Sequence, residues 1–420
     1  MFFSYKDKLK TAQLGIMNTG RWFTDGLSIL MVALTIIIVA LCIVWVHSLD
    51  EIQADTVVCI KVIEFCLVNA FATTDLLNFY IFFELSAIPL LFLIGRRGPS
   101  DRRIKAAQYF LGYTLFGSAF LLSAVLVIHN ITGSTNYYDV LVNIENFTPA
   151  QLNFIWLCFF IAFAVKIPTV PFHLWLLEAH VEAPTTGSVL LAAVLLKIGG
   201  YGLIRFCIQL LGNTSTYFYP LVFTIGICSV LFATLNAFIQ IDLKRIIAYS
   251  SIAHMNASVL ALFSLTNIGY KAAVISMLSH GFTAAGLFFL AGVLYKIYHT
   301  KNILYFGGLG QIMPRFTVFF MFFVLSNIGF PSTLNFVGEF LSLAAVQESS
   351  IFLACIFLIK TGILFIFFMS LINRICFLEL DTRFLKHFND LNNKELGVLT
   401  VLLVLTFIFG VYADGILCLL

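Results

Sequence analysis

Charged residues are scarce in this 420-residue chain: Asp, Glu, Lys and Arg make up 11% of it, whereas soluble domains carry about 25%. Hydrophobic residues account for 60%. This composition excludes an ordinary soluble globular protein and indicates an integral membrane protein. The formal net charge is only +3, and no basic face of the kind that binds nucleic acid is evident, so we expect no nucleic-acid partner.

Several motifs of redox and secreted proteins are also missing. None of the nine cysteines forms a Cys-x-x-Cys pair, and nearly all lie in apolar runs, which argues against an iron–sulfur site or a disulfide framework. No Gly-rich dinucleotide fingerprint follows a strand pattern; Gly307, Gly308 and Gly310 form an isolated loop cluster. The first 20 residues contain no continuous apolar core of a signal peptide. We therefore expect no cofactor and no metal in this chain.

Apolar runs long enough to cross a membrane recur along almost the whole chain. A spanning helix needs about 20 mostly apolar residues. The sequence therefore predicts an all-α, polytopic membrane protein with about twelve transmembrane helices. Because no linker is long enough to separate domains, residues 25–420 are predicted to form one transmembrane domain after an N-terminal segment, 1–24. The approximate ranges of the spans are 27–47, 57–74, 76–95, 106–128, 152–177, 185–209, 218–239, 244–263, 271–295, 316–343, 350–373 and 396–418.

Lysine and arginine are unevenly divided between the two sides of the membrane that this order of spans defines. Loops on one side hold 14 of them, and the opposite loops hold two, Arg205 and Lys271. The basic side is therefore predicted to face the cytoplasm or the mitochondrial matrix. Four further basic residues conflict with this orientation, because they precede the first span on the other side: Lys6, Lys8, Lys10 and Arg21.

Four ionisable side chains are predicted to lie well inside the bilayer, where each costs roughly 2.5–3.5 kcal/mol on insertion scales. They cannot easily reach the membrane surface by snorkelling. We expect them to face the interior of the bundle, a partner or water, and to carry function rather than only to hold helices together. They are Glu84, Lys166, Lys197 and Glu339.

Other ionisable residues in the spans keep two interpretations. His254 and His280 are either hydrogen-bonded core residues or members of a proton path, and we include them in the candidate site. His173 keeps the same two interpretations and is left unassigned. The sequence also assigns no role to Lys61 and Glu64, which are near a helix end, or to Lys360, which is mid-span without an obvious partner.

Two of the predicted spans contain helix breakers at corresponding places. Pro168 and Pro171 interrupt the fifth, and Asn327–Pro331 interrupts the tenth. Each break comes fourth in a set of five helices, about 57–209 and about 218–373. Because five is odd, the second set is inserted upside down, which predicts an inverted repeat. Proline leaves carbonyl groups without an N–H partner, and in a membrane these need protein or water, so each break favours a polar pocket; a plain packing kink is the alternative.

Five stretches resemble the antiporter-like membrane subunits of respiratory complex I, NADH:ubiquinone oxidoreductase. The resemblance covers most of the chain from about Asp25 onward, and its lysine-containing stretch is the most specific. The stretches are FYIFFELSAIPL (79–90), FAVKIPTVPFHLWLLEAHVEAPTTGSVLLAAVLLKIGGYG (163–202), DLKRIIAYSSIAHMN (242–256), SHGFTAAGLFFLAGVLY (279–295) and GFPSTLNFVGEF (329–340).

The resemblance implies a proton-translocating subunit of the membrane arm. The family's functional positions are a glutamate, the lysine of the first broken helix, a lysine of the next helix, two membrane histidines and a charged residue in the second broken helix. One branch of the family carries an acid at the last position, where sister subunits tend to have lysine. The matching residues here are Glu84, Lys166, Lys197, His254, His280 and Glu339.

The resemblance also implies partners. We expect other membrane-arm subunits, including neighbouring antiporter-like subunits, and lipids, with flavin mononucleotide, iron–sulfur clusters and ubiquinone in partner subunits. Family members usually have fourteen spans, and no pair of spans is evident before Asp25; these helices are lost or supplied by a separate polypeptide, which would account for the basic N-terminal stretch. The 46 phenylalanines, typical of AT-rich coding, and the lack of a visible presequence favour the mitochondrial inner membrane, with basic loops toward the matrix.

Two other functions are compatible with the sequence. A subunit of a multi-subunit cation/proton antiporter, which works without redox coupling, would share the pattern of buried lysines and glutamates. A membrane scaffold would use the same charges only to hold helices together. Glu339, where a lysine would be the other choice, favours the complex I interpretation over the antiporter.

Overall fold

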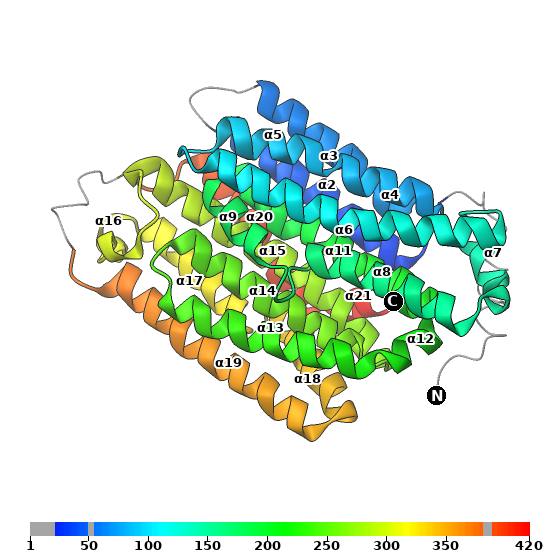
Figure 1. The fold of residues 1–420 in the computed structure, drawn as a ribbon. Coiled ribbons are helices and arrows are strands. Elements are labelled where there is room, and N and C mark those ends of the chain that lie inside the picture. The colour runs from blue at the N-terminus through cyan, green and yellow to red at the C-terminus, as the bar shows by residue number, and fades with distance from the viewer. Residues whose placement is uncertain (1–21, 49–53, 381–388) are drawn as a thin grey trace.

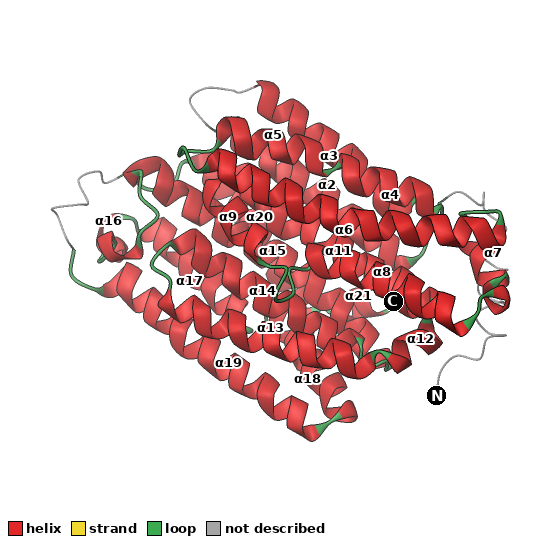
Figure 2. Ribbon diagram, viewed as in Figure 1, coloured by secondary structure: helices red, strands yellow, loops and turns green. Residues whose placement is uncertain are grey.

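The computed structural model describes residues 22–48, 54–380 and 389–420, and nearly all of these residues lie in helices (Figures 1 and 2). Within these ranges no β-strand is formed, and the extended pairings are three isolated bridges. The predicted all-α class is confirmed. Most of the predicted N-terminal segment 1–24, including its four basic residues, lies outside the described residues.

The helices follow the predicted spans in order. The first half contains α2 (Gly26–Val46), α3 (Ala54–Ala72), α4 (Leu76–Leu85) with its continuation α5 (Ala87–Arg97), α6 (Arg103–Thr132), α7 (Tyr137–Val142), α8 (Pro149–Lys166), α9 (Leu174–Glu182), a long mixed helix Thr185–Leu210 made of α10 (Thr185–Leu190), η2 (Leu191–Leu195), α11 (Leu196–Gly202) and η3 (Leu203–Leu210), and α12 (Gly212–Tyr217). The second half contains α13 (Tyr219–Ile239), α14 (Leu243–Leu262), α15 (Asn267–Tyr298), α16 (Leu309–Ile312), α17 (Pro314–Ile328), α18 (Leu334–Ser349), α19 (Ile351–Ile372), α20 (Asn393–Val411) and α21 (Asp414–Leu417).

Every predicted span is occupied by helix, and the two predicted breaks are present: α8 and α9 share the fifth predicted span, and α17 and α18 share the tenth. Among the described residues, nine helices are long and apolar enough to cross a membrane. The total of twelve crossings and the inverted repeat stay predictions.

Burial divides the bundle into central and peripheral helices. The most apolar windows of Thr185–Leu210 and of α15 are 100% and 94% buried, whereas those of α19 and α20 are 33% and 28% buried. A helix at the edge of such a bundle can be apolar all round because it faces lipid, whereas ionisable side chains need the interior of the protein. The central pair therefore carries the polar residues that are hardest to reach from lipid.

The basic loops meet at one end of the bundle, which we call the basic end. There Arg96 and Arg97 contact Asp55, and Lys394 donates to the carbonyl of His47. At the opposite end Arg205 pairs with Asp25. Basic residues of the two predicted groups of loops thus lie at opposite ends of the bundle; which end faces the matrix stays a prediction.

Candidate functional site: a buried series of ionisable side chains

Side chains of the bundle form hydrogen bonds with the backbone of the break between α8 and α9. The indole of Trp175 donates to the carbonyl of Val165 (2.8 Å), and the N–H of Val170 donates to the hydroxyl of Ser229 (2.8 Å). These contacts give hydrogen-bond partners to a carbonyl and an N–H group that the break leaves without partners in the helix. The break also leaves Lys166 as the last residue of α8, where the negative end of the helix dipole favours a cation.

The Lys166 ammonium is buried against aromatic rings. Its Nζ lies 4.5 Å from the centroid of Phe83 and 5.9 Å from that of Phe110, distances at which a cation–π interaction is favourable. Glu84 follows Phe83 at the end of α4, and its Oε1 is buried without a hydrogen-bond partner among the described residues. Its charge acts on Lys166, but the two side chains form no ion pair within the described part of the chain. The two side chains are close enough to interact electrostatically but are not in direct contact.

Lys197 lies at the centre of the bundle with no exposed surface. Its Nζ donates to the carbonyl of Ala192 (2.5 Å) and lies 2.7 Å from Nδ1 of His280. Ala192 belongs to the π-helical stretch Leu191–Leu195, whose i→i+5 pattern frees carbonyls that an α-helix would use. The local π-helix thus provides an acceptor for the lysine inside an apolar core.

Two glycines let the helix of Lys197 approach its neighbours on both sides. A Cβ at Gly199 would lie 2.7 Å from Cγ1 of Ile167 and 3.1 Å from Cβ of Lys166, and a Cβ at Gly200 would lie 2.3 Å from Sδ of Met277. Gly199 therefore sets the distance to the first broken helix, and Gly200 sets the distance to α15, which carries His280.

We predict that Gly199→Ala destabilises the assembled protein by about 1–3 kcal/mol, because the added methyl overpacks the contact with Ile167. Gly112→Ala, in α6, is the matched control, since a Cβ there meets nothing within 4 Å. Thermal unfolding of the purified assembly measures both. Equal melting temperatures for the two variants would show that the close approach at Gly199 is dispensable.

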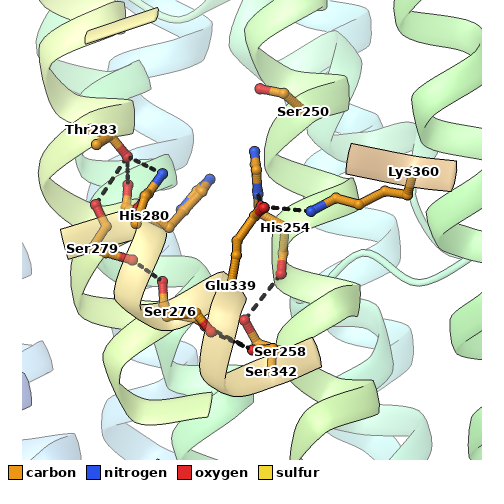
Figure 3. A network of polar contacts seen from close by, with 12 residues as sticks. Ser250, His254, Ser258, Ser276, Ser279, His280, Thr283, Glu339, Ser342 and Lys360 are labelled. Carbon is orange, nitrogen blue, oxygen red and sulfur yellow. Dashed lines mark hydrogen bonds and ion pairs between the residues drawn. The ribbon is translucent and has the colours of Figure 1, made fainter. Parts of the chain in front are cut away.

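A second cluster lies on the other side of His280. Oε1 of Glu339 is 2.8 Å from Nδ1 of His254 and 2.6 Å from Nζ of Lys360, so one carboxylate oxygen faces both partners (Figure 3). The three residues come from α18, α14 and α19. Lys360 is fully buried, and Glu339 supplies the opposite charge that such a lysine needs.

The two histidines connect this cluster to Lys197. The ring centroids of His254 and His280 are 6.0 Å apart, and Nε2 of each ring is buried without a partner among the described residues. Beside them is a cavity of about 10 Å³, lined also by Glu339 and Asn335. This is close to the space that one water molecule needs. The structure thus brings Lys197, His280, His254 and Glu339 into one continuous polar series.

Comparison with known proteins identifies the family. The family described as NADH:quinone oxidoreductase/Mrp antiporter, TM, matches residues 73–365. NADH-ubiquinone oxidoreductase chain 4 of Chondrus crispus is 41% identical over 397 residues, which cover 94% of this chain and 80% of that protein. NADH-quinone oxidoreductase subunit M of Rickettsia prowazekii is 39% identical over 396 residues, with coverages of 94% and 80%. The chain belongs to the NADH-ubiquinone oxidoreductase chain 4 family.

Solved structures agree with this chain 4 assignment. A chain of the structure of respiratory complex I from Thermus thermophilus with bound NADH matches 95% of this chain and 84% of its own length, with a TM-score of 0.85 and 29% identity. A chain of the Mrp complex from Dietzia sp. has the same TM-score of 0.85 at 20% identity, over 95% of this chain and 83% of its own. The second match shows a shared fold.

Two residues of this chain 4 family member lie in the polar interior although they were not among the predicted site residues. Lys360 is the ion-pair partner of Glu339; a mid-span cation in the helix after a buried acid was the available signal. His180, in α9, is fully buried and stacks on Phe288 (4.5 Å between centroids). Its position between Glu178 and Glu182 in the sequence does not indicate this burial.

The unassigned residues take different places. His173 precedes α9 and packs its ring edge against Phe232 of α13 (5.0 Å between centroids), because the helix of Lys166 has already ended. Lys61 pairs with Glu64 (2.8 Å) on the surface of α3, with 57% of the lysine side chain exposed. Neither His173 nor this pair contacts the polar series.

Proposed function

We propose that this chain is a proton-translocating membrane-arm subunit of NADH:ubiquinone oxidoreductase. Protons move along the buried relay formed by Glu84, Lys166, Lys197, His280, His254 and Glu339, and quinone is reduced in other subunits. The observation that carries the proposal is the pair of buried contacts, Lys197 with His280 and His254 with Glu339, whose two histidine rings lie 6.0 Å apart between centroids. The relatives, which are named as subunits of this oxidoreductase, support the redox coupling.

The proposed mechanism depends on the distance between Glu84 and Lys166. A buried ammonium keeps its proton when a carboxylate faces it and releases the proton more readily when the carboxylate moves away. Lysine suits this exchange because, unlike arginine, it gives up its proton on burial. Lys166 then passes a proton toward Lys197, whose Nζ already contacts His280.

The free energy available from a change in ion pairing is comparable with the work of moving a proton across the membrane. Moving one charge against 100 mV costs about 2.3 kcal/mol. A change of two pKa units in a buried group corresponds to about 2.7 kcal/mol. A modest change in one ion-pair distance is therefore sufficient to drive a step, and the separated arrangement of Glu84 and Lys166 is one of the two states that the mechanism needs.

Replacing Lys166 or Glu84 by alanine is expected to lower proton pumping and the coupled quinone reduction about tenfold or more, with assembly largely kept. Lys61→Ala, which removes an exposed lysine of α3, is the control. Pumping is measured in vesicles that contain the purified complex, with NADH as the electron donor. Normal pumping in either relay variant would refute the ion-pair mechanism.

A cation/proton antiporter without redox coupling is the second candidate function, because the Mrp complex shares the fold. The named relatives at about 40% identity favour the oxidoreductase. The two functions differ in a simple measurement: sodium transport by the purified assembly without NADH would favour the antiporter, and NADH-driven quinone reduction would favour the oxidoreductase.

The proposed setting follows from the same function. The chain associates with other membrane-arm subunits, including neighbouring antiporter-like subunits, and with lipids. Flavin mononucleotide, iron–sulfur clusters and ubiquinone belong to partner subunits. We place the chain in the mitochondrial inner membrane with its basic end toward the matrix, and protease protection of this end in intact organelles would test that orientation.

A further inference from the structure

His180 is a buried polar residue that the relay described above does not use. Its side chain has no exposed surface, and both ring nitrogens are buried without a hydrogen-bond partner among the described residues. Burying an unpaired polar group is costly, so such a group in a packed core calls for an explanation. A neutral imidazole offers one donor and one acceptor nitrogen, which is what a group needs to take up a proton on one side and release one on the other.

A cavity at the basic end is lined in part by residues 183–186, which follow His180 closely in the chain. It has a volume of about 240 Å³, and its lining joins the ends of several helices: Trp45 and Val46 of α2, Thr56 of α3, Arg97 of α5, Thr185 of α10, Lys244 of α14 and Tyr295 of α15. The volume is enough for several water molecules.

Helix α15 shows how His180 is placed between this cavity and the relay. His280, Ala284, Phe288 and Gly292 are spaced by four residues, so each is a neighbour of the next along a row that winds gradually around the helix. His280 contacts Lys197, and Gly292 lines the cavity. At 1.5 Å per residue the two are about 18 Å apart along the helix. His180 stacks on Phe288, between them.

Hydrogen bonds connect the cavity with the backbone of His180. Lys244, which lines the cavity, donates to the hydroxyl of Ser188 (3.4 Å) and to the carbonyl of Ala183 (2.7 Å). Ser188 in turn donates to the carbonyl of His180 (3.2 Å). The charges of Lys244 and Lys197 both act on the His180 ring, and the ring also interacts with His280. His180 is thus within electrostatic reach of the cavity and of the relay.

We propose that His180 transfers protons from the basic-end cavity to Lys197 and His280. A hydrated proton in the cavity passes to the ring nitrogen that carries none, and the other ring nitrogen releases its proton to Lys197 once that lysine has passed on its own. The ring is then neutral again in its other tautomer, and a flip of the ring restores the first. This role rests on the proposed function, because it supplies the protons that the relay moves. It divides a distance of about 18 Å into two shorter steps.

His180→Phe tests the proposal, with His173→Phe as the matched control. His173 immediately precedes α9 and His180 lies within it. Both side chains are buried, and neither has a hydrogen-bond partner for its ring nitrogens among the described residues. His173, however, contacts α13 rather than the relay. In vesicles with the assembled complex, His180→Phe is expected to lower proton pumping per assembled complex about a hundredfold. His173→Phe is expected to stay within about twofold of the unchanged protein, below the contribution of an acid–base group.

A second variant and a second readout separate proton transfer from packing. His180→Gln keeps a polar side chain but cannot exchange protons, so it too is expected to pump slowly, with a larger solvent deuterium isotope effect on turnover. Normal pumping in either variant overturns the proposal, and so does a failure of both to assemble, which would show a packing role. If Lys197→Ala also pumps normally, the proposed function itself fails; if Lys197→Ala is inactive and His180→Phe is active, only the role of His180 fails.

Discussion

Lys197→Ala is expected to abolish proton translocation and to lower NADH-driven quinone reduction about a hundredfold, the lower part of the range that a positioned acid–base group contributes. Lys197 has no exposed surface, and its ammonium bridges the carbonyl of Ala192 and the ring of His280. Alanine removes the group that receives a proton from the first half of the series and gives it to the second. A methyl group in its place cannot carry a proton, and no other titratable side chain contacts Nδ1 of His280 within the described residues.

The Lys197 experiment needs proof that the loss is not a folding defect. Replacing a fully buried lysine removes a polar group and leaves a cavity, so assembly must be measured with activity. The amount of assembled complex is expected to fall less than activity does. Full pumping by an assembled Lys197→Ala complex would show that protons bypass this residue.

The second large effect is expected at the Glu339–Lys360 pair. Glu339→Ala leaves the buried ammonium of Lys360 without its carboxylate, and breaking a buried ion pair on one side costs about 3–5 kcal/mol. We expect much less assembled complex and no pumping. Because His254 contacts the same carboxylate oxygen, the change also removes the acceptor at the end of the histidine pair.

A paired substitution separates the structural effect from the functional one. In Glu339→Gln with Lys360→Met no buried charge is left alone, so assembly is expected to return toward the level of the unchanged protein. Pumping is expected to stay lost, because neither new side chain exchanges protons. Blue-native electrophoresis and vesicle pumping measure the two quantities. Recovered pumping in the double variant would mean that the pair only stabilises the fold.

The sequence was sufficient for those features that depend on local chemistry. Pro168, Pro171 and Pro331 mark the two helix breaks, because proline acts on its own backbone and on the preceding turn. The apolar runs likewise place the helices, since about 20 apolar residues have few other uses. The two breaks therefore agree between sequence and structure to within a few residues.

The contacts between helices could not be predicted in the same way. The pairings of Lys197 with His280 and of Glu339 with Lys360 depend on which helix faces which. Membrane spans give little periodic signal for this, because apolar residues face both lipid and the neighbouring helices. The π-helical stretch beside Lys197 has no sequence marker. His173 could not be placed from the sequence either, because the helix that carries Lys166 ends before it.

Proton release by vesicles that contain the Lys197→Arg complex, measured together with electron transfer, tests the central claim most directly. Arginine keeps the positive charge but does not give up its proton, so a fixed-charge role and a relay role predict different results. If protons pass through the buried series, the assembled variant neither pumps nor sustains coupled quinone reduction. Pumping with the unchanged ratio of protons to electrons would contradict the relay and would leave Lys197 as a fixed charge.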